Sequence, residues 1–130
     1  MATRGDSELP TDLGLRRALA RIAAAESAAQ VLRSVQTYLS TWPRERVVRL
    51  QLLDGGWAPF DEKQRPSRIN GVRDLQRVHN AVRRQCELLR QSAIAPNPEL
   101  IELDEVLYVA VQAAQLLQAR KSKAQSEGAA

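Results

Sequence analysis

The segment "NPELIELDEVLYVAVQAAQLLQARK", residues 97–121, decides the kind of fold that this chain adopts. Asn97 suits the N-cap of a helix, and Pro98 suits the first helical position, where no amide hydrogen is needed. Acidic side chains at the start and basic side chains at the end complement the helix dipole. These are Glu99, Glu102, Asp104 and Glu105 at the start, and Arg120, Lys121 and Lys123 at the end. We predict a helix from Glu99 to about Lys121.

The middle of this predicted helix is strongly apolar. Ten of the twelve residues 106–117 are apolar. A helix that is apolar nearly all round must be buried on most sides. We therefore expect it to be either the central helix of a bundle or a subunit interface. The predicted self-association residues are Val106, Val109, Ala110, Ala113 and Leu117.

Residues 11–41 carry apolar side chains at three- and four-residue spacing, the pattern of an amphipathic helix. The stretch "SAAQ", residues 27–30, has the spacing of a capping box, which would let the helix break near Glu26 and restart. Because the apolar stripe continues almost in phase through this stretch, we predict one unbroken helix of about thirty residues.

Two further helices are predicted in the middle of the chain. Pro43 ends the first helix, and a short helix follows over residues 44–54. A strand over residues 46–53 stays open as an alternative, because apolar residues alternate there before an Asp-Gly pair typical of hairpin turns. Asn70 is the predicted N-cap of a third long helix, which ends before Pro96. One face of that helix carries Val72, Leu75, His79, Val82, Cys86 and Leu89.

Residues 55–69 form a long irregular connection that holds two of the few aromatic side chains. Loops of this length tend to be functional or disordered. Trp57 and Phe60 either pin the loop over the end of the bundle or serve as exposed anchors for a partner. Pinning is the favoured interpretation, and the sequence leaves both open. The predicted partner-binding residues are Trp57, Phe60, Arg65 and Arg68.

The predicted fold class is therefore all-α: a small helical bundle of three long helices and one short helix, with a long irregular loop. Residues 1–9 are polar and are predicted to be a disordered tail. The helical-bundle domain is predicted to span residues 10–121, and residues 122–130 to form a second disordered tail.

Composition limits the class of protein. The chain has 130 residues, which suits one domain with its own core. The N-terminal residues lack the apolar stretch of a signal peptide, and residues 106–117 are too short and too polar to span a bilayer. A single cysteine excludes an intrachain disulfide. We expect a cytoplasmic protein without membrane contact. Its 19 Ala and 16 Arg suggest a GC-rich bacterial coding sequence.

Charge is distributed unevenly along the chain. Residues 44–93 carry eleven basic and six acidic groups, whereas residues 94–119 carry four acidic groups and no basic one. A nucleic-acid interface in the basic middle is the alternative hypothesis for function, with Trp57 and Phe60 as stacking platforms beside the arginines of residues 65–90. Its predicted helical residues are Arg73, Arg77, Arg83, Arg84 and Arg90.

Few residues offer catalytic chemistry. We expect the single histidine, His79, to be partly buried with a hydrogen-bond partner, and Cys86, two helical turns away, to be a small buried apolar residue. Glu99, Glu102 and Glu105 are interpreted as solvated first-turn carboxylates. Phosphate-binding loops, dinucleotide fingerprints and metal motifs are absent from the sequence. We predict no enzyme activity, cofactor, metal or small-molecule substrate.

The leading hypothesis for function is a non-enzymatic helical interaction module with an assembly or regulatory role. Its predicted partners are a second copy of itself, in a homodimer or higher oligomer, and another protein. The over-apolar last helix and the Ala-rich first helix, which allows close helix approach, support this hypothesis.

Overall fold

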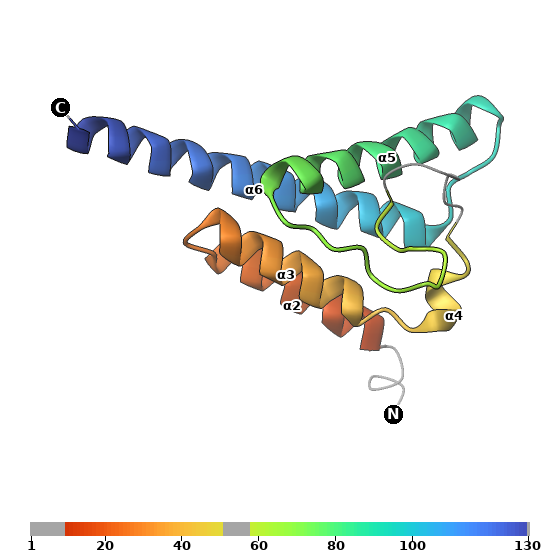
Figure 1. The fold of residues 1–130 in the computed structure, drawn as a ribbon. Helices are drawn as coiled ribbons and strands as arrows, with labels where there is room; N and C mark the ends of the chain where they lie inside the picture. The colour runs from red at the N-terminus through yellow and green to blue at the C-terminus, as the bar shows by residue number, and fades with distance from the viewer. Residues whose placement is uncertain (1–9, 51–57, 130) are drawn as a thin grey trace.

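The computed structural model describes residues 10–50 and 58–129. Within these ranges the chain forms five helices and no strand, so the all-α class is confirmed (Figure 1). The helices are α2 (Pro10–Ala24), α3 (Ala28–Ser40), α4 (Arg44–Val47), α5 (Val72–Gln91) and α6 (Pro98–Ala129). The bundle therefore has one helix more than the sequence predicted.

The extra helix arises because the predicted single helix over residues 11–41 is broken at residues 25–27. Ser27 adopts an extended conformation and its side-chain oxygen accepts a hydrogen bond from the Gln30 amide. The Gln30 side chain in turn accepts one from the Glu26 amide at 2.8 Å. Local capping thus overrides the continuous apolar stripe. It lets α2 and α3 fold back on each other as a hairpin (Figure 1).

Close packing within this hairpin depends on a small residue near the start of α2. A Cβ atom added at Gly14 would lie 3.2 Å from the Oγ1 atom of Thr41, at the end of α3. Such a contact is tighter than ordinary van der Waals packing. Gly14 therefore lets the two helices approach closely at this end.

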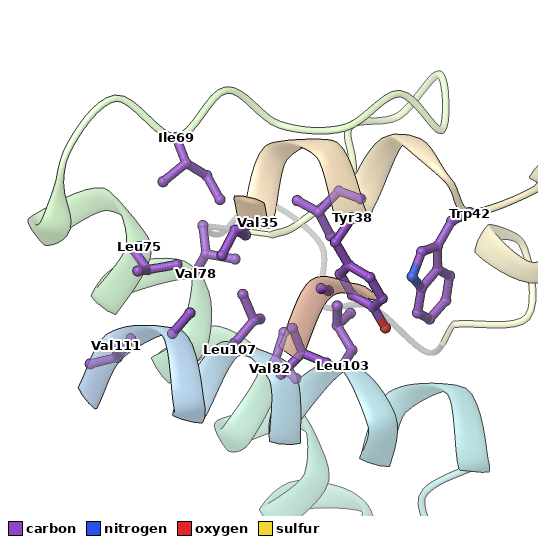
Figure 2. Packing of buried hydrophobic residues seen from close by; sticks show 14 of the residues in the cluster. Val35, Tyr38, Trp42, Ile69, Leu75, Val78, Val82, Leu103, Leu107 and Val111 are labelled. Atoms are coloured by element: carbon purple, nitrogen blue, oxygen red, sulfur yellow. The ribbon is translucent and has the colours of Figure 1, made fainter. Parts of the chain in front are cut away.

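Helix α6 is the centre of the bundle, as one of the two predicted alternatives required. It contacts α5 on one side and the α2–α3 hairpin on the other. Side chains from α3, α5 and α6 meet in one apolar cluster (Figure 2). The residues of α6 that this core buries are Leu100, Leu103, Val106, Leu107, Ala110, Val111 and Ala114.

Both ends of α6 can be compared with their predictions. At the start, Asn97 is the N-cap, as predicted: its Oδ1 atom accepts a hydrogen bond from the Leu100 amide at 3.0 Å. Its Nδ2 atom donates to the carbonyl oxygen of Arg49, which fixes the start of α6 against the chain that follows α4. At the other end, α6 continues to Ala129 and does not stop near Lys121. The predicted disordered tail is thus helical through most of its length.

A buried carboxylate joins three helices at one end of the core. Glu102 of α6 accepts a hydrogen bond from the Tyr38 hydroxyl of α3. Its Oε1 atom also forms an ion pair with the Nη2 atom of Arg46, in α4, at 2.7 Å. The side chains of Arg46 and Glu102 are only 9% and 14% exposed. The prediction that Glu102 is a solvated carboxylate is therefore wrong: helix α4 brings a cation over it. Burial, together with Glu102, raises the pKa of Tyr38 far above its usual range, so this hydroxyl stays a donor.

Aromatic rings enclose this ion pair. The guanidinium carbon of Arg46 lies 3.9 Å from the centroid of the Trp42 ring, a cation–π contact. The Trp42 ring also contacts Tyr38 edge-on and Phe60 from the loop, with centroids 6.2 and 5.6 Å apart. The Trp42 ring thus covers Arg46, and the ion pair is largely shielded from water, which strengthens its hydrogen bonds and makes any unpaired charge there costly.

The described part of the long loop, residues 58–69, is ordered by contacts with α3. The Gln36 side chain donates to the Ser67 carbonyl at 2.9 Å and accepts from the Ile69 amide at 3.1 Å. Ile69 is buried, and Phe60 is 3% exposed against Trp42. Phe60 therefore pins the loop, which corrects the expectation that it anchors a partner. Trp57 lies outside the described residues.

We predict that Glu102→Gln lowers the free energy of unfolding by about 3 kcal/mol, because Arg46 then keeps a buried charge without its counter-ion. Urea unfolding followed by circular dichroism measures this loss. The matched control is Glu105→Gln, the same change at an exposed position three residues further along α6. The control should change stability by no more than about 0.5 kcal/mol. If both variants lost the same free energy of unfolding, the buried carboxylate of Glu102 would contribute no more to stability than an exposed one.

Candidate functional site

A polar cluster lies between α5 and α6. The Nε2 atom of His79 is 3.2 Å from the Oδ1 atom of Asp104, and the Nε atom of Arg83 is 3.6 Å from the same oxygen. Tyr108 covers the cluster, with its ring centroid 5.9 Å from that of His79 and 5.3 Å from the Arg83 guanidinium carbon. His79 is 6% exposed. The prediction of a buried histidine with a hydrogen-bond partner is thus confirmed.

This cluster orients an imidazole but offers no nucleophile beside it. Cys86 lies about 10.5 Å further along the axis of α5. It is buried, and burial raises the pKa of its thiol, which keeps it protonated and unreactive. Among the described residues, no group of three or more His, Cys, Asp or Glu side chains could hold a metal ion. The geometry therefore fits a polar contact that fixes α5 against α6.

The other end of α6 forms a surface of a different kind. Helix α6 has 32 residues and α5 has 20, so α6 is longer by about 18 Å at 1.5 Å per residue. Its last part, drawn in dark blue, extends past all the other helices (Figure 1). We call residues 115–123, the last residues of α6 whose side chains are described, the overhang; its residues 117–121 lie beside the turn between α2 and α3. Within it, Leu116 is 55% exposed and Leu117 is half-buried.

A groove separates the overhang from the turn between α2 and α3. It has a volume of about 630 Å³. Small side chains form its hairpin wall, and Leu117 lies on the opposite wall. Its charged groups are one acid from the hairpin and two bases from α6. The lining residues are Ala25, Glu26, Ser27, Ala28, Ala29, Leu117, Gln118, Arg120 and Lys121.

The predicted self-association residues divide into two groups. Val106 and Ala110 are completely buried inside the chain, which corrects their assignment to an interface: α3 and α5 cover them. Val109, Ala113 and Leu117 are half-buried at the edge of the core. The large apolar side chains that α6 leaves exposed are different ones. They are Ile101 at 46%, Tyr108 at 44% and Leu116 at 55%.

These three residues share one stripe of α6 with Glu105 and Gln112. At 100° per residue the stripe spans about 80° of the helix surface. Exposed apolar residues scattered singly are normal on a protein surface. Three on one helix face, running into an uncovered overhang, instead form the described surface best suited to a helical partner.

The predicted nucleic-acid residues are only partly available. Arg65 pairs with Asp61 at 3.3 Å, and Arg83 is engaged by Asp104 and Tyr108. Arg77 also has an interaction partner. Phe60 is buried and cannot stack on a base. The remaining predicted arginines are exposed: Arg68, Arg73, Arg84 and Arg90.

Sequence reasoning missed the contacts of Arg46 and the exposed stripe of α6. Arg46 is one of three arginines within six residues, and nothing in its local pattern marks it as the buried one. The stripe could have been found, because Ile101 and Tyr108 are seven residues apart and so share a helix face. The high apolar content of residues 106–117 instead led to a prediction of self-association residues that include the core-facing Val106 and Ala110.

Comparisons with known proteins do not assign this chain. No family model matches it, and neither the curated proteins nor the solved structures gave a match. In the described part of the chain, no helix combines the length and apolar content that crossing a membrane requires.

The His79 environment predicts how stability depends on pH. Burial is the main cause that lowers the pKa of His79, although Asp104 opposes it. Because the folded state disfavours the protonated ring, the stabilising contribution is complete above the unfolded pKa of about 6.5. It is lost as the pH falls below that value toward the folded pKa. We expect urea unfolding to show lower stability at pH 5.5 than at pH 7.5.

The control for this prediction is His79→Gln, which keeps a neutral polar side chain at the position. It should remove most of the pH dependence between 7.5 and 5.5 while leaving the helical content unchanged. If the unmodified protein became more stable on acidification, protonated His79 would be the favoured state, and burial would not control its titration.

Proposed function

We propose that this chain is a non-enzymatic helical interaction module that associates with a second copy of itself through α6. The observation that carries the proposal is the overhang, where Leu116 is exposed and Leu117 is half-buried beside the turn between α2 and α3. Helices in water acquire most of their stability from packing of an apolar face. A second copy that covered this stretch would supply that packing.

Charge favours a second copy as the occupant of the groove beside the overhang. The groove carries Glu26 on its hairpin wall and Arg120 and Lys121 on its helical wall. In a two-fold symmetric dimer the same patch meets itself, so the overhang of one copy crosses the groove of the other. Its two bases then face the partner's acidic residue, and Leu116 gains apolar cover. The groove and the overhang thus carry charges of both signs for such a contact.

The exposed stripe offers a second contact surface, on the side of α6 away from the groove-lining residues. Tyr108 and Ile101 continue the face of Leu116 along α6, and aromatic side chains are favoured at interface centres. The same stripe would accept a helix of a different protein, which is the second partner class in the proposal. An assembly or regulatory role, in the cytoplasm, follows as part of the same proposal.

The test is the variant Leu116→Glu, which places a charge in the centre of the proposed interface. We expect the unmodified protein to dimerise with rising concentration in sedimentation velocity. The variant should raise the dimer dissociation constant at least about tenfold, equivalent to 1.4 kcal/mol. The matched control is Val48→Glu: Val48 is also 55% exposed but lies beside α4. This control should dimerise like the unmodified protein.

A protein that stayed monomeric up to several hundred micromolar would contradict the proposal. So would equal weakening by both substitutions, because that would show a general effect of added charge. Circular dichroism of each variant confirms that the bundle is intact before the comparison is made.

A further inference from the structure

The outer face of the α2–α3 hairpin and the adjoining loop carry a chain of three connected hollows. The first, of about 300 Å³, lies between α2 and α3 near Gly14 and Thr41. The second, of about 510 Å³, follows the same helices toward the hairpin turn and shares Arg21 and Thr37 with the first. The third, of about 570 Å³, lies between α3 and the loop and shares Arg33 with the second.

Basic side chains follow these hollows, and acidic ones do not. The arginine track, as we call it, consists of Arg17 and Arg21 from α2, Arg33 from α3 and Arg68 from the loop. Among the residues whose side chains the structure describes, none that lines the three hollows is Asp or Glu. Arg17 and Arg21 are one helical turn apart, about 6 Å along the axis, so their charges repel each other.

Nothing described in the chain neutralises this track. In the described ranges, no ion pair or hydrogen bond involves the guanidinium groups of Arg17, Arg21, Arg33 or Arg68. Arg46, Arg65 and Arg83, in contrast, do have acidic partners. Four cations without an acidic partner along these shallow hollows favour an extended anion as ligand.

The other groups along the track indicate the kind of anion. Hydroxyl and amide side chains line the hollows between the arginines, and those of Gln30, Thr37 and Asn70 can donate hydrogen bonds to phosphate oxygens. The donors of Ser34, Gln36 and Thr41 are already bonded to backbone carbonyls. The only aromatic lining residue is Tyr38, which is 2% exposed, so no ring is available to stack on a base. The polar lining residues are Gln30, Ser34, Gln36, Thr37, Thr41 and Asn70.

We propose that the arginine track binds the phosphate backbone of a nucleic acid and does not read its sequence. This interface lies on α2, α3 and the loop, shares only Arg68 with the arginines of residues 65–90 that the sequence predicted, and does not depend on self-association through α6. Arginine suits the role because its planar guanidinium forms paired hydrogen bonds with phosphate oxygens. An acidic peptide is the competing occupant, and the experiment below distinguishes it from DNA.

The experiment measures binding of a fluorescent 20-base-pair DNA duplex by anisotropy at 50 and 200 mM salt. If the four arginines each neutralise one phosphate, affinity should fall about 150-fold between these salt concentrations, from a slope near −0.9 per phosphate. The double variant Arg21→Gln/Arg33→Gln should bind more weakly, and its affinity should fall only about 12-fold over the same range. Duplexes of unrelated sequence should bind equally well.

The matched control is Arg73→Gln/Arg84→Gln, which removes the same charge from exposed positions on α5. It should keep the full salt dependence. If this control lost binding and the Arg21/Arg33 variant did not, the arginines of α5 would form the interface and the proposal would be overturned. No duplex binding at 50 mM salt would overturn it, and so would a polyglutamate peptide of equal charge that bound as tightly as DNA. Sedimentation of the Arg21/Arg33 variant should show unchanged dimerisation, which separates this test from that of the α6 interface.

Discussion

The fold depends on how one carboxylate, that of Glu102, is satisfied inside the bundle. A buried carboxylate is costly unless it is paired and hydrogen-bonded. Here the Tyr38 hydroxyl and the Arg46 guanidinium both donate to it, so α3, α4 and α6 must meet in one arrangement. An apolar core tolerates small shifts of its helices, whereas this contact does not. It therefore fixes the position of α6 against the hairpin. The four-residue helix α4 contributes by placing Arg46 beside the carboxylate.

Sequence patterns predicted the parts of the fold that follow from helical periodicity and local capping. The start of α6 at Asn97 and Pro98, the burial of Cys86 and the long helix α5 all agree with the structure. The break before Ser27 was visible as a capping box but was outweighed by the apolar stripe. In the structure the helix breaks at the cap, because folding back lets both halves of the apolar stripe, one on α2 and one on α3, pack into the same core.

The partners of charged side chains were harder to predict, because they depend on which elements meet. Glu102 and Glu105 look alike in the sequence, yet one is buried beside Arg46 and the other is exposed. The arginine track has the same origin: Arg17, Arg33 and Arg68 are distant in the chain and converge only because the hairpin closes beneath the loop. Contacts between distant segments decide both the buried ion pair and the basic surface, and no local pattern encodes them.

The place of α6 in the chain has a consequence for synthesis. Its core residues cover both the hairpin and α5, and all of these precede it in sequence. While a ribosome is making the chain, the apolar faces of α2, α3 and α5 emerge without the helix that shelters them. Nascent chains with such exposed surface are prone to aggregation and are typical clients of chaperones. The bundle closes only after the residues around Ala114 have been added to the growing chain.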